Sequence, residues 1–401
     1  MQQSARYQAV FELLEEIFKD KLPADVSVAN YMKSRRYIGS KDRRFIADTV
    51  WEIVRKRMRL SFEAKSNEVR KIFLVFLKDE DFDLITGGQY GLTPLNAEEK
   101  KWLKSLKEEV YPNYVNAECP KWLYEKIGDE ALISSLNKPA SVDIRANFIG
   151  RSELKNRLKS EGLFFSETPY SPFGLRSSER INLNNCTAYQ EGLFEIQDES
   201  CQVASLLMNV RASEKIVDYC AGAGGKSLAL GAILGNEGLI LCHDVCFNRM
   251  DAIKARAERL GIKNLKLIRD VGDNDFDCFI LDAPCSGTGT WRRAPDAKFR
   301  LTPEKLKELV QIQADVLEKA YQRTKKGGRI VYMTCSVLKE ENEDVVEEFV
   351  LRHKDVSFVD HKEIWAKKLD LKYPFGVSKY LRFSPLLTNT DGFFFCMMKK
   401  N

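Results

Sequence analysis

The second half of the chain alternates short apolar segments with stretches of helical spacing, and this alternation restricts the fold more than any other feature. The apolar segments are EKIVDYC from Glu214, EGLILCHDV from Glu237, FDCFILDAPC from Phe276 and GGRIVYMTCS from Gly327. Apolar segments joined by helices favour a doubly wound parallel sheet. We therefore predict a Rossmann-like α/β fold from about residue 205, with the terminal DGFFFCMMKK as one further strand.

The first 200 residues follow two other patterns. Between residues 1 and 135, apolar side chains recur at helical spacing, as in YQAVFELLEEIF. The segment ASVDIRANFI alternates as a strand does, and the helix-like SELKNRLKSEG follows it. The sequence thus predicts a helical domain at 1–135, a small α/β domain at 140–205 and the Rossmann-like domain at 206–401.

The composition is that of a soluble protein, with 44% hydrophobic and 30% charged residues. No run is apolar enough to span a bilayer, and the acidic, amphipathic N-terminus is unlike a signal peptide. The ten cysteines lack the spacing of zinc ligands and the chain has only three histidines, so we expect no metal site. We expect free thiols, a cytoplasmic location, no membrane association and a monomer.

The segment YCAGAGGKSLAL follows the first apolar strand and is the most informative glycine-rich stretch. Its Gly-Lys-Ser resembles the end of a P-loop, which needs a glycine five positions before its Gly-Lys. Cys220 occupies that position, counting back from Gly225. The sequence therefore favours the glycine turn of an adenosine cofactor site over a nucleoside triphosphate site.

The strand ends support the cofactor interpretation, because ligands of open α/β sheets gather at the carboxyl ends of the strands. Asp244 ends the second strand, where an acid hydrogen-bonds the ribose hydroxyls in such folds. Asp282 and Cys285 end the third strand, and Cys335 ends the fourth. A single free cysteine is often only core filling. Two cysteines at neighbouring strand ends are a stronger indication of a site.

Two cysteines in one crevice suit chemistry on a pyrimidine. A thiolate is a good nucleophile, and its addition to C6 of cytosine makes C5 able to accept a methyl group. The C5 proton and the thiolate must then leave. Such a scheme needs a nucleophile, an acid near N3, a methyl donor and assistance with elimination.

Several long motifs make the chain similar to a known family. DYCAGAGGKS, LDAPCSGTGTWRRAPDAKFR, LKEENEDVVEEF after YMTCS, and the terminal DGFFF closely resemble the bacterial RNA cytosine-C5 methyltransferases of the RsmB/NOP (Sun/Fmu) family. The N-terminal segment resembles the NusB-like helical domain of the RsmB branch, and the 140–205 region resembles the family's RRM-like subdomain. The resemblance covers nearly the whole chain and implies a class I methyltransferase that acts on 16S rRNA.

The resemblance also implies site roles. Cys335 would attack C6, Cys285 would assist release of the methylated RNA, and Lys226 would lie close to the reacting centre. Asp282 would contact both the cofactor and the base. The residues expected to hold S-adenosylmethionine are Cys220, Ala221, Gly222, Ala223, Gly224, Gly225, Lys226, Asp244, Asp270 and Asp282.

The chain departs from the family pattern in three places. Gly222-Ala223 stands where the family has Ala-Pro, which leaves the affinity for the cofactor open. Ala294 stands where the family has a histidine, which puts an RNA contact in question. The segment between Asp270 and Asp282 is shorter than in the family, so Asp273 competes with Asp270 as the acid on the adenosine side.

Basic residues provide candidate RNA contacts. Between Lys33 and Lys71 the chain has 13 lysines and arginines against 5 acidic residues, and such a face can follow a phosphate backbone. A solvated surface is the alternative for each residue taken singly. The expected RNA-binding residues are Arg292, Arg293, Lys298 and Arg300 after the Cys285 loop, with Arg35, Arg36, Arg43 and Arg44 in the helical domain.

Two alternatives to an rRNA methyltransferase remain open from the sequence. A tRNA cytosine-C5 methyltransferase would use the same chemistry. A non-catalytic RNA-binding or ribosome-assembly factor would keep the scaffold without binding the cofactor, although both cysteines are present.

Overall fold

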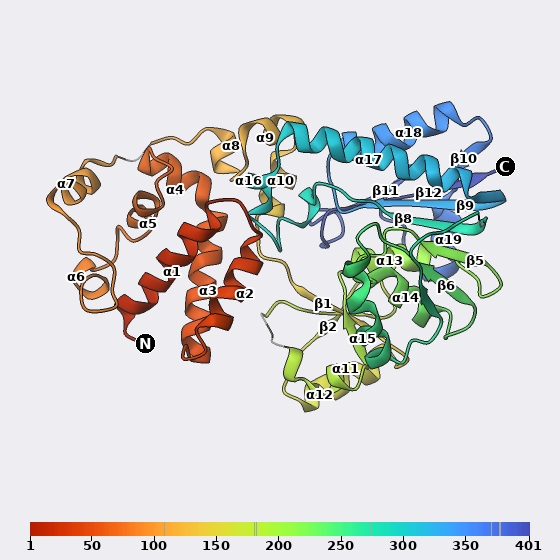
Figure 1. Cartoon of the computed structure of the whole chain (residues 1–401), viewed down its shortest axis with the longest axis horizontal. Helices are drawn as coiled ribbons and strands as arrows, with labels where there is room; N and C mark the ends of the chain where they lie inside the picture. Colours follow the sequence, from red (N-terminus) through yellow and green to blue (C-terminus); the bar gives the residue numbers. More distant parts are fainter. Residues whose placement is uncertain (108, 180, 182, 274, 370, 377) are drawn as a thin grey trace. The chain divides into compact units, whose positions relative to one another are not determined.

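The computed structural model describes residues 1–107, 109–179, 181, 183–273, 275–369, 371–376 and 378–401 (Figure 1). The chain forms two compact units. The first consists of Met1–Lys138 and Thr290–Thr302, and the second of Pro139–Gly289 and Pro303–Asn401. No helix of the described residues is long and apolar enough to cross a membrane.

The first unit is helical, which confirms the helical pattern expected for residues 1–135. Its longer helices are amphipathic, and their apolar faces meet in one core that includes Val10, Leu14, Ile46, Val50 and Phe73. The helices are α1 (Gln3–Ile17), α2 (Ala24–Ser34), α3 (Ser40–Arg55), α4 (Arg57–Ala64), α5 (Val69–Phe76), α6 (Phe82–Ile85), α7 (Ala97–Ser105), α8 (Asn113–Asn116), α9 (Lys121–Ile127), α10 (Glu130–Leu136) and α16 (Ala297–Arg300).

Residues 290–302 belong to this helical unit, although the sequence placed them inside the domain at 206–401. Arg55 donates a hydrogen bond of 2.6 Å to the carbonyl oxygen of Arg292. The backbone N–H of Ala24 donates to Asp296 Oδ2 at 3.0 Å, and Lys298 Nζ donates to Asn137 Oδ1 at 2.8 Å. Such long-range contacts are not visible in local sequence patterns, so the sequence boundaries miss this insertion.

The second unit begins with a small antiparallel sheet of order β2-β3-β1-β4. The strand and helix expected from ASVDIRANFI and SELKNRLKSEG are confirmed as β1 and α11. Ile144, Leu154, Leu158, Leu175 and Phe194 form its core. Its elements are β1 (Val142–Ala146), α11 (Arg151–Ser160), β2 (Ser166–Glu167), β3 (Gly174–Ser177), η1 (Leu183–Asn185), α12 (Thr187–Gln190) and β4 (Phe194–Ile196).

The main sheet has the strand order β10-β12-β9-β8-β5-β6-β7, with β11 paired to β12. Neighbouring strands from β7 to β9 run parallel, whereas β12 is antiparallel to both β9 and β10. All five strands expected from the apolar segments are confirmed. The strands are β5 (Lys215–Asp218), β6 (Leu239–Cys242), β7 (Leu265–Leu267), β8 (Phe276–Asp282), β9 (Thr324–Thr334), β10 (Val356–Phe358), β11 (Leu381–Phe383) and β12 (Phe393–Lys400).

Helices cover both faces of the main sheet, as its nearly continuous apolar strands require. Helices α13 and α19 cover one face, and α17 and α18 cover the other (Figure 1). Ile280 and Val331 belong to the core on the first face, and Leu281 and Ile330 to the core on the second. The remaining helical elements are α13 (Glu199–Leu207), α14 (Gly225–Ile233), η2 (Phe247–Met250), α15 (Asp251–Leu260), η3 (Thr288–Thr290), α17 (Pro303–Gln322), η4 (Lys339–Glu341), α18 (Glu343–Arg352) and α19 (His361–Leu369).

Candidate active site

The glycine turn connects the end of β5 to the start of α14, as the sequence predicts. Gly222 and Gly224 have φ values of 52° and 83°, in the left-handed region that favours glycine. A Cβ on Gly224 would lie 2.7 Å from Ile253 Cγ1. A Cβ on Gly222 would lie 3.0 Å from a guanidinium nitrogen of Arg249, so the glycine at this departure from the family pattern leaves room for that side chain.

Asp244 is buried at the end of β6 and faces the glycine turn. Its Oδ2 accepts a hydrogen bond of 2.9 Å from the N–H of Gly222, and its Oδ1 accepts one of 2.9 Å from the N–H of Cys246. Arg249 lies 3.4 Å from Oδ2. These contacts fix the carboxylate at the strand end where an acid binds ribose hydroxyls in this kind of sheet.

A cavity of about 260 Å³ opens beside Asp244. It is lined by Tyr219, His243, Asp244, Val245, Phe247 and Arg269. The rings of Tyr219 and His243 stack with centroids 4.2 Å apart, and Arg269 lies 4.1 Å from the Phe247 ring centroid. A pocket with aromatic walls and one fixed acid suits the adenosine part of a cofactor. Sequence reasoning singled out Asp244 alone, although the other five residues also lie at or just after strand ends.

The two acids that compete for the adenosine side lie outside that lining. Asp270 is exposed, and the N–H of Gly272 lowers the pKa of its carboxyl group. Asp273 is fully exposed and forms an ion pair of 2.9 Å with Arg323. Asp270 directly follows Arg269, which lines the cavity, so its position favours Asp270 over Asp273 as the acid nearer the cofactor.

Lys226 and Asp282 form an ion pair beneath the glycine turn. Lys226 lies in the first turn of α14, and its Nζ is 2.6 Å from Asp282 Oδ2 at the end of β8. Burial lowers the pKa of Lys226, but the neighbouring acidic groups, Asp282 foremost, together raise it. Lys226 is therefore a permanent cation beside Asp282. Gln197 supports the turn by donating to the carbonyl oxygen of Gly225 at 3.1 Å.

The structure brings Cys285 and Cys335 together, with their sulfur atoms 3.3 Å apart. The two residues follow the neighbouring parallel strands β8 and β9, whose pairing ends at Asp282 and Met333. Gly289 donates to the carbonyl oxygen of Cys335 at 2.9 Å. A Cβ on Gly289 would lie 2.0 Å from the carbonyl oxygen of Gly392, so only glycine permits this close approach.

The shared hydrogen bond distinguishes the two thiols. The hydrogen bond to Cys335 raises the pKa of Cys285 well above its usual value, and burial adds to the effect. A raised pKa favours the protonated thiol at Cys285, and either of the two sulfur atoms can be the donor of the hydrogen bond. When Cys285 is the donor, the Cys335 sulfur is the better placed of the two to react as a nucleophile.

Asp218, at the end of β5, should make the stability of the folded protein depend on pH. Burial raises the pKa of its carboxyl group from 3.8 to about 7, although Ser227 Oγ donates to Oδ2 at 2.6 Å. Among the described residues, none donates to its Oδ1. The folded protein thus holds this proton to a higher pH than the unfolded chain does.

We expect Asp218→Asn to stabilise the protein at pH 8 and to have little effect at pH 4. A raised carboxyl pKa costs stability progressively as pH rises from about 4 to about 7, and the full cost, about 4 kcal/mol, applies above that. Thermal unfolding of both proteins between pH 4 and pH 8 measures the difference, with the exposed Asp273→Asn as control. An equal Tm gap at both ends of the range would contradict the raised pKa.

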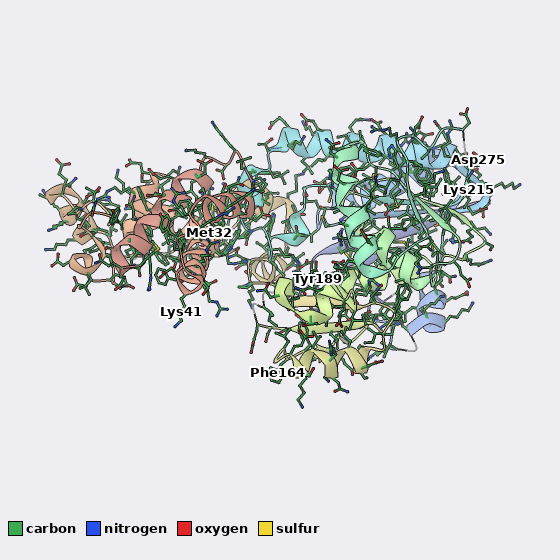
Figure 2. The ribbon with its side chains drawn as sticks, turned by 60° about the horizontal axis from the view of Figure 1, so that its bottom comes forward. Met32, Lys41, Phe164, Tyr189, Lys215 and Asp275 are labelled. Carbon is green, nitrogen blue, oxygen red and sulfur yellow. The ribbon has the colours of Figure 1, made fainter. Side chains whose placement is uncertain are left out.

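The predicted RNA-binding residues of the helical unit differ in exposure. Arg36, Arg44 and Arg293 are exposed. Lys41, which lies between Arg36 and Arg44 in the sequence, projects from the start of α3 (Figure 2). Arg35 stacks on Tyr31 and pairs with Glu12 at 3.3 Å, whereas Arg43 donates to the carbonyl oxygen of Ile38 at 2.7 Å.

Three of the predicted RNA-binding side chains are buried or ion-paired in the structure. They are Lys298, Arg292 and Arg300. Lys298 is 1% exposed, and burial lowers its pKa to about 8. Arg292 is 7% exposed, and Arg300 pairs with Asp296 at 2.9 Å. Burial of Lys298 and Arg292 corrects the expectation that their side chains line an RNA path.

The sheet and the strand-end groups together define a class of protein. A parallel Rossmann-like sheet with an antiparallel last strand beside β9, a glycine turn after β5 and an acid after β6 is the architecture of a methyltransferase. Comparisons with known proteins agree with this class. Residues 205–399 match the family model described as 16S rRNA methyltransferase RsmB/F. Residues 205–399 of the chain therefore belong to the RsmB/F family of methyltransferase domains.

Two curated relatives carry related names. The chain is 29% identical over 331 residues to the probable ribosomal RNA small subunit methyltransferase B of Bacillus subtilis, covering 74% of this chain and 72% of the relative. It is 29% identical over 286 residues to the ribosomal RNA small subunit methyltransferase F of Vibrio campbellii, covering 68% of this chain. That alignment spans 59% of the Vibrio protein, less than two thirds of its length.

Two solved structures share the fold. PH0851 covers 98% of this chain and 99% of its own, with a TM-score of 0.78 and 22% identity. A methyltransferase homologue from Pyrococcus horikoshii covers 73% of this chain and all of its own, with a TM-score of 0.61 and 26% identity. The similarity to PH0851 extends over the helical and α/β parts alike.

Proposed function

We propose that the protein transfers a methyl group from S-adenosylmethionine to C5 of a cytosine in small-subunit rRNA, through a covalent bond between Cys335 and C6. The observation that carries the proposal is the pair of sulfur atoms 3.3 Å apart at the ends of β8 and β9. Membership of a family of rRNA methyltransferases and the names of the relatives support RNA as the substrate.

The cofactor's place in this proposal is the glycine turn and the cavity beside Asp244. Asp244 would bind the ribose hydroxyls, and Tyr219, Phe247 and Arg269 would surround the base. When bound, S-adenosylmethionine supplies an electrophilic methyl group. Asp270, Asp282 and the turn residues 220–226 remain our proposed contacts to the rest of the cofactor.

Cys335 begins the reaction by bonding to C6 of the cytosine, and its proton passes by way of Asp282 to N3 of the base. The electron pair of the C5–C6 double bond then becomes available at C5 for the methyl group. Asp282, held by Lys226 at 2.6 Å, is the group that we assign to N3 of the base. The base must reach the site unstacked, because this chemistry cannot be done inside a helix.

Cys285 completes the reaction after methyl transfer. The C5 proton must leave and the bond between sulfur and C6 must break. The hydrogen bond to Cys335 is the largest cause of the raised pKa of Cys285. We assign to Cys285 both proton movements of this step: its thiol gives a proton to the Cys335 sulfur as the bond between that sulfur and C6 breaks, and it takes the C5 proton in its place, so both thiols are restored.

The substrate class is tested by transfer of labelled methyl from S-adenosylmethionine to unmodified small-subunit rRNA and, separately, to tRNA. Each RNA is offered free, and the rRNA also within an assembling particle. Label in rRNA is the expected result. Label in tRNA alone would reassign the substrate, and label in neither RNA would favour a binding factor without catalysis.

Asp244→Ala should weaken binding of S-adenosylmethionine by about 10- to 100-fold, because hydrogen bonds to a charged group contribute about 1.5–3 kcal/mol. Titration calorimetry with the cofactor alone measures the effect. Asp273→Ala, which removes a fully exposed carboxylate, is the matched control and should bind as the wild type does. Unchanged affinity of Asp244→Ala would exclude the cavity beside Asp244 as the cofactor site.

A further inference from the structure

Two buried polar residues, Glu341 and Asn342, lie between the cysteine turns and α18, and the chemistry assigned above does not use them. Each is 0% exposed. Glu341 ends η4 and Asn342 directly precedes α18. Together we name them the Glu341–Asn342 brace.

Glu341 fixes the backbone around Cys285. Its carboxylate accepts hydrogen bonds from the N–H of Ser286, at 2.8 Å, and from the Ser286 hydroxyl. Gln313 on α17 donates through one amide group both to Glu341, at 3.0 Å, and to the carbonyl oxygen of Pro284, at 2.8 Å. Pro284 is thus bonded to Gln313 and Ser286 to Glu341, and these two side chains are bonded to each other.

Asn342 does the same for Cys335. The Thr334 hydroxyl donates to Asn342 Oδ1 at 2.6 Å, and Asn342 Nδ2 donates to the carbonyl oxygen of Ser336 at 2.9 Å. The residues before and after Cys335 are therefore both bonded to one amide group. Tyr332 on β9 adds a hydrogen bond of 2.6 Å to the backbone carbonyl oxygen of Glu341.

The turns are also joined to each other by hydroxyl groups. Thr288 Oγ1 and Ser336 Oγ lie 3.0 Å apart, and the N–H of Val337 donates to Thr288 Oγ1 at 3.0 Å. The brace and these hydroxyl groups form one buried network. Such networks hold a single geometry when all their members are bonded.

Burial of the Glu341 carboxylate costs free energy, so its presence is poorly explained by a contribution to folding stability alone. Among the described residues, Glu341 has hydrogen-bond donors but no lysine or arginine as an ion-pair partner. A buried carboxylate without a cation loses much of its hydration energy, whereas an apolar side chain of similar size would fill the same space without that cost. Its contacts are concentrated on one reactive turn.

We propose that Glu341 and Asn342 are positioning residues that hold the Cys285 and Cys335 thiols in hydrogen-bond contact. The catalytic consequence rests on the proposed function: an aligned pair of thiols directs Cys335 at C6. Misplacement of a reacting group by about 1 Å can cost a factor of about 100 in rate. The geometric part of the proposal requires no RNA and no cofactor.

Thiol oxidation tests the geometric part directly. Diamide oxidises two adjacent thiols to a disulfide and is itself reduced to the hydrazine, so the protein loses two hydrogen atoms. The rate at which the Cys285–Cys335 disulfide forms is followed by peptide mapping in wild type, Glu341→Gln and Asn342→Ala. We expect rapid formation in wild type and a rate about tenfold lower in both variants.

Glu348→Gln is the matched control, since it makes the same substitution on the exposed face of α18. Its disulfide should form at the wild-type rate. Thermal unfolding is measured for every variant. If Glu341→Gln does not fold, Ser286→Ala removes one donor to the carboxylate and should produce a smaller decrease in the oxidation rate.

The kinetic readout separates positioning from a merely structural role. For folded variants of the brace, kcat for methyl transfer should fall about 10- to 100-fold while KM for S-adenosylmethionine stays within about twofold. If all folded variants form the disulfide at the wild-type rate, the proposal that Glu341 and Asn342 position the thiols is wrong, whatever the methylation assay shows. Slower oxidation in a protein that methylates no RNA would support the brace and reject the proposed function.

Discussion

Cys335→Ala should abolish methyl transfer to RNA and leave binding of S-adenosylmethionine within about twofold of wild type. Without the thiol no bond to C6 can form, and C5 remains a poor nucleophile, so we expect a loss of at least about 10³-fold. The cavity beside Asp244 does not include Cys335, so the cofactor should still bind. Label transfer measures the first effect and calorimetry the second.

The exposed Cys246 provides a control for loss of a thiol at another position. Cys246→Ala should keep both activity and cofactor affinity near the wild-type values. Activity retained by Cys335→Ala would show that another group is the nucleophile. Loss of cofactor binding in that variant would instead show that the two sites are not separate.

Cys285→Ala should accumulate a covalent complex between protein and RNA. Removal of Cys285 leaves Cys335 able to attack but removes the group that we assign to the C5 proton, so the adduct forms faster than it resolves. Incubation with RNA and S-adenosylmethionine should give a band of reduced mobility on a denaturing gel. Digestion of the RNA with ribonuclease should return the band close to the position of the free protein.

The double variant Cys285→Ala/Cys335→Ala is the control for the identity of the bond. It should form no adduct, because the sulfur that bonds to C6 is absent. An adduct of equal yield in the double variant would exclude Cys335 as the attachment point. Full turnover by Cys285→Ala without any adduct would remove Cys285 from the release step.

Much of the site could be predicted from the sequence, because its residues follow the ends of predicted parallel strands. Parallel strands place their carboxyl ends at one edge, so Asp244, Asp282, Cys285 and Cys335 could be assigned to one crevice before the structure was known. The structure then places the two sulfur atoms 3.3 Å apart and Lys226 2.6 Å from Asp282. The glycine turn was predictable because its strand and helix patterns flank it directly.

Other parts of the molecule depend on contacts that local patterns do not contain. Strand β7 (Leu265–Leu267) has three residues and only two apolar side chains, which is too short for a recognisable alternation. Residues 290–302 look like a basic loop in the sequence, yet Lys298 is buried and donates a hydrogen bond to Asn137, which is distant in the chain. The Glu341–Asn342 brace likewise appears only when η4 is placed against both cysteine turns.

The most direct test of the central claim is the identity of the methylated nucleoside. Wild-type protein is incubated with labelled S-adenosylmethionine and unmodified small-subunit rRNA, and the RNA is digested to nucleosides and separated by chromatography. The account predicts that the label migrates with 5-methylcytidine and disappears with Cys335→Ala. Label in any other nucleoside, or none from free rRNA and from an assembling particle, would contradict it.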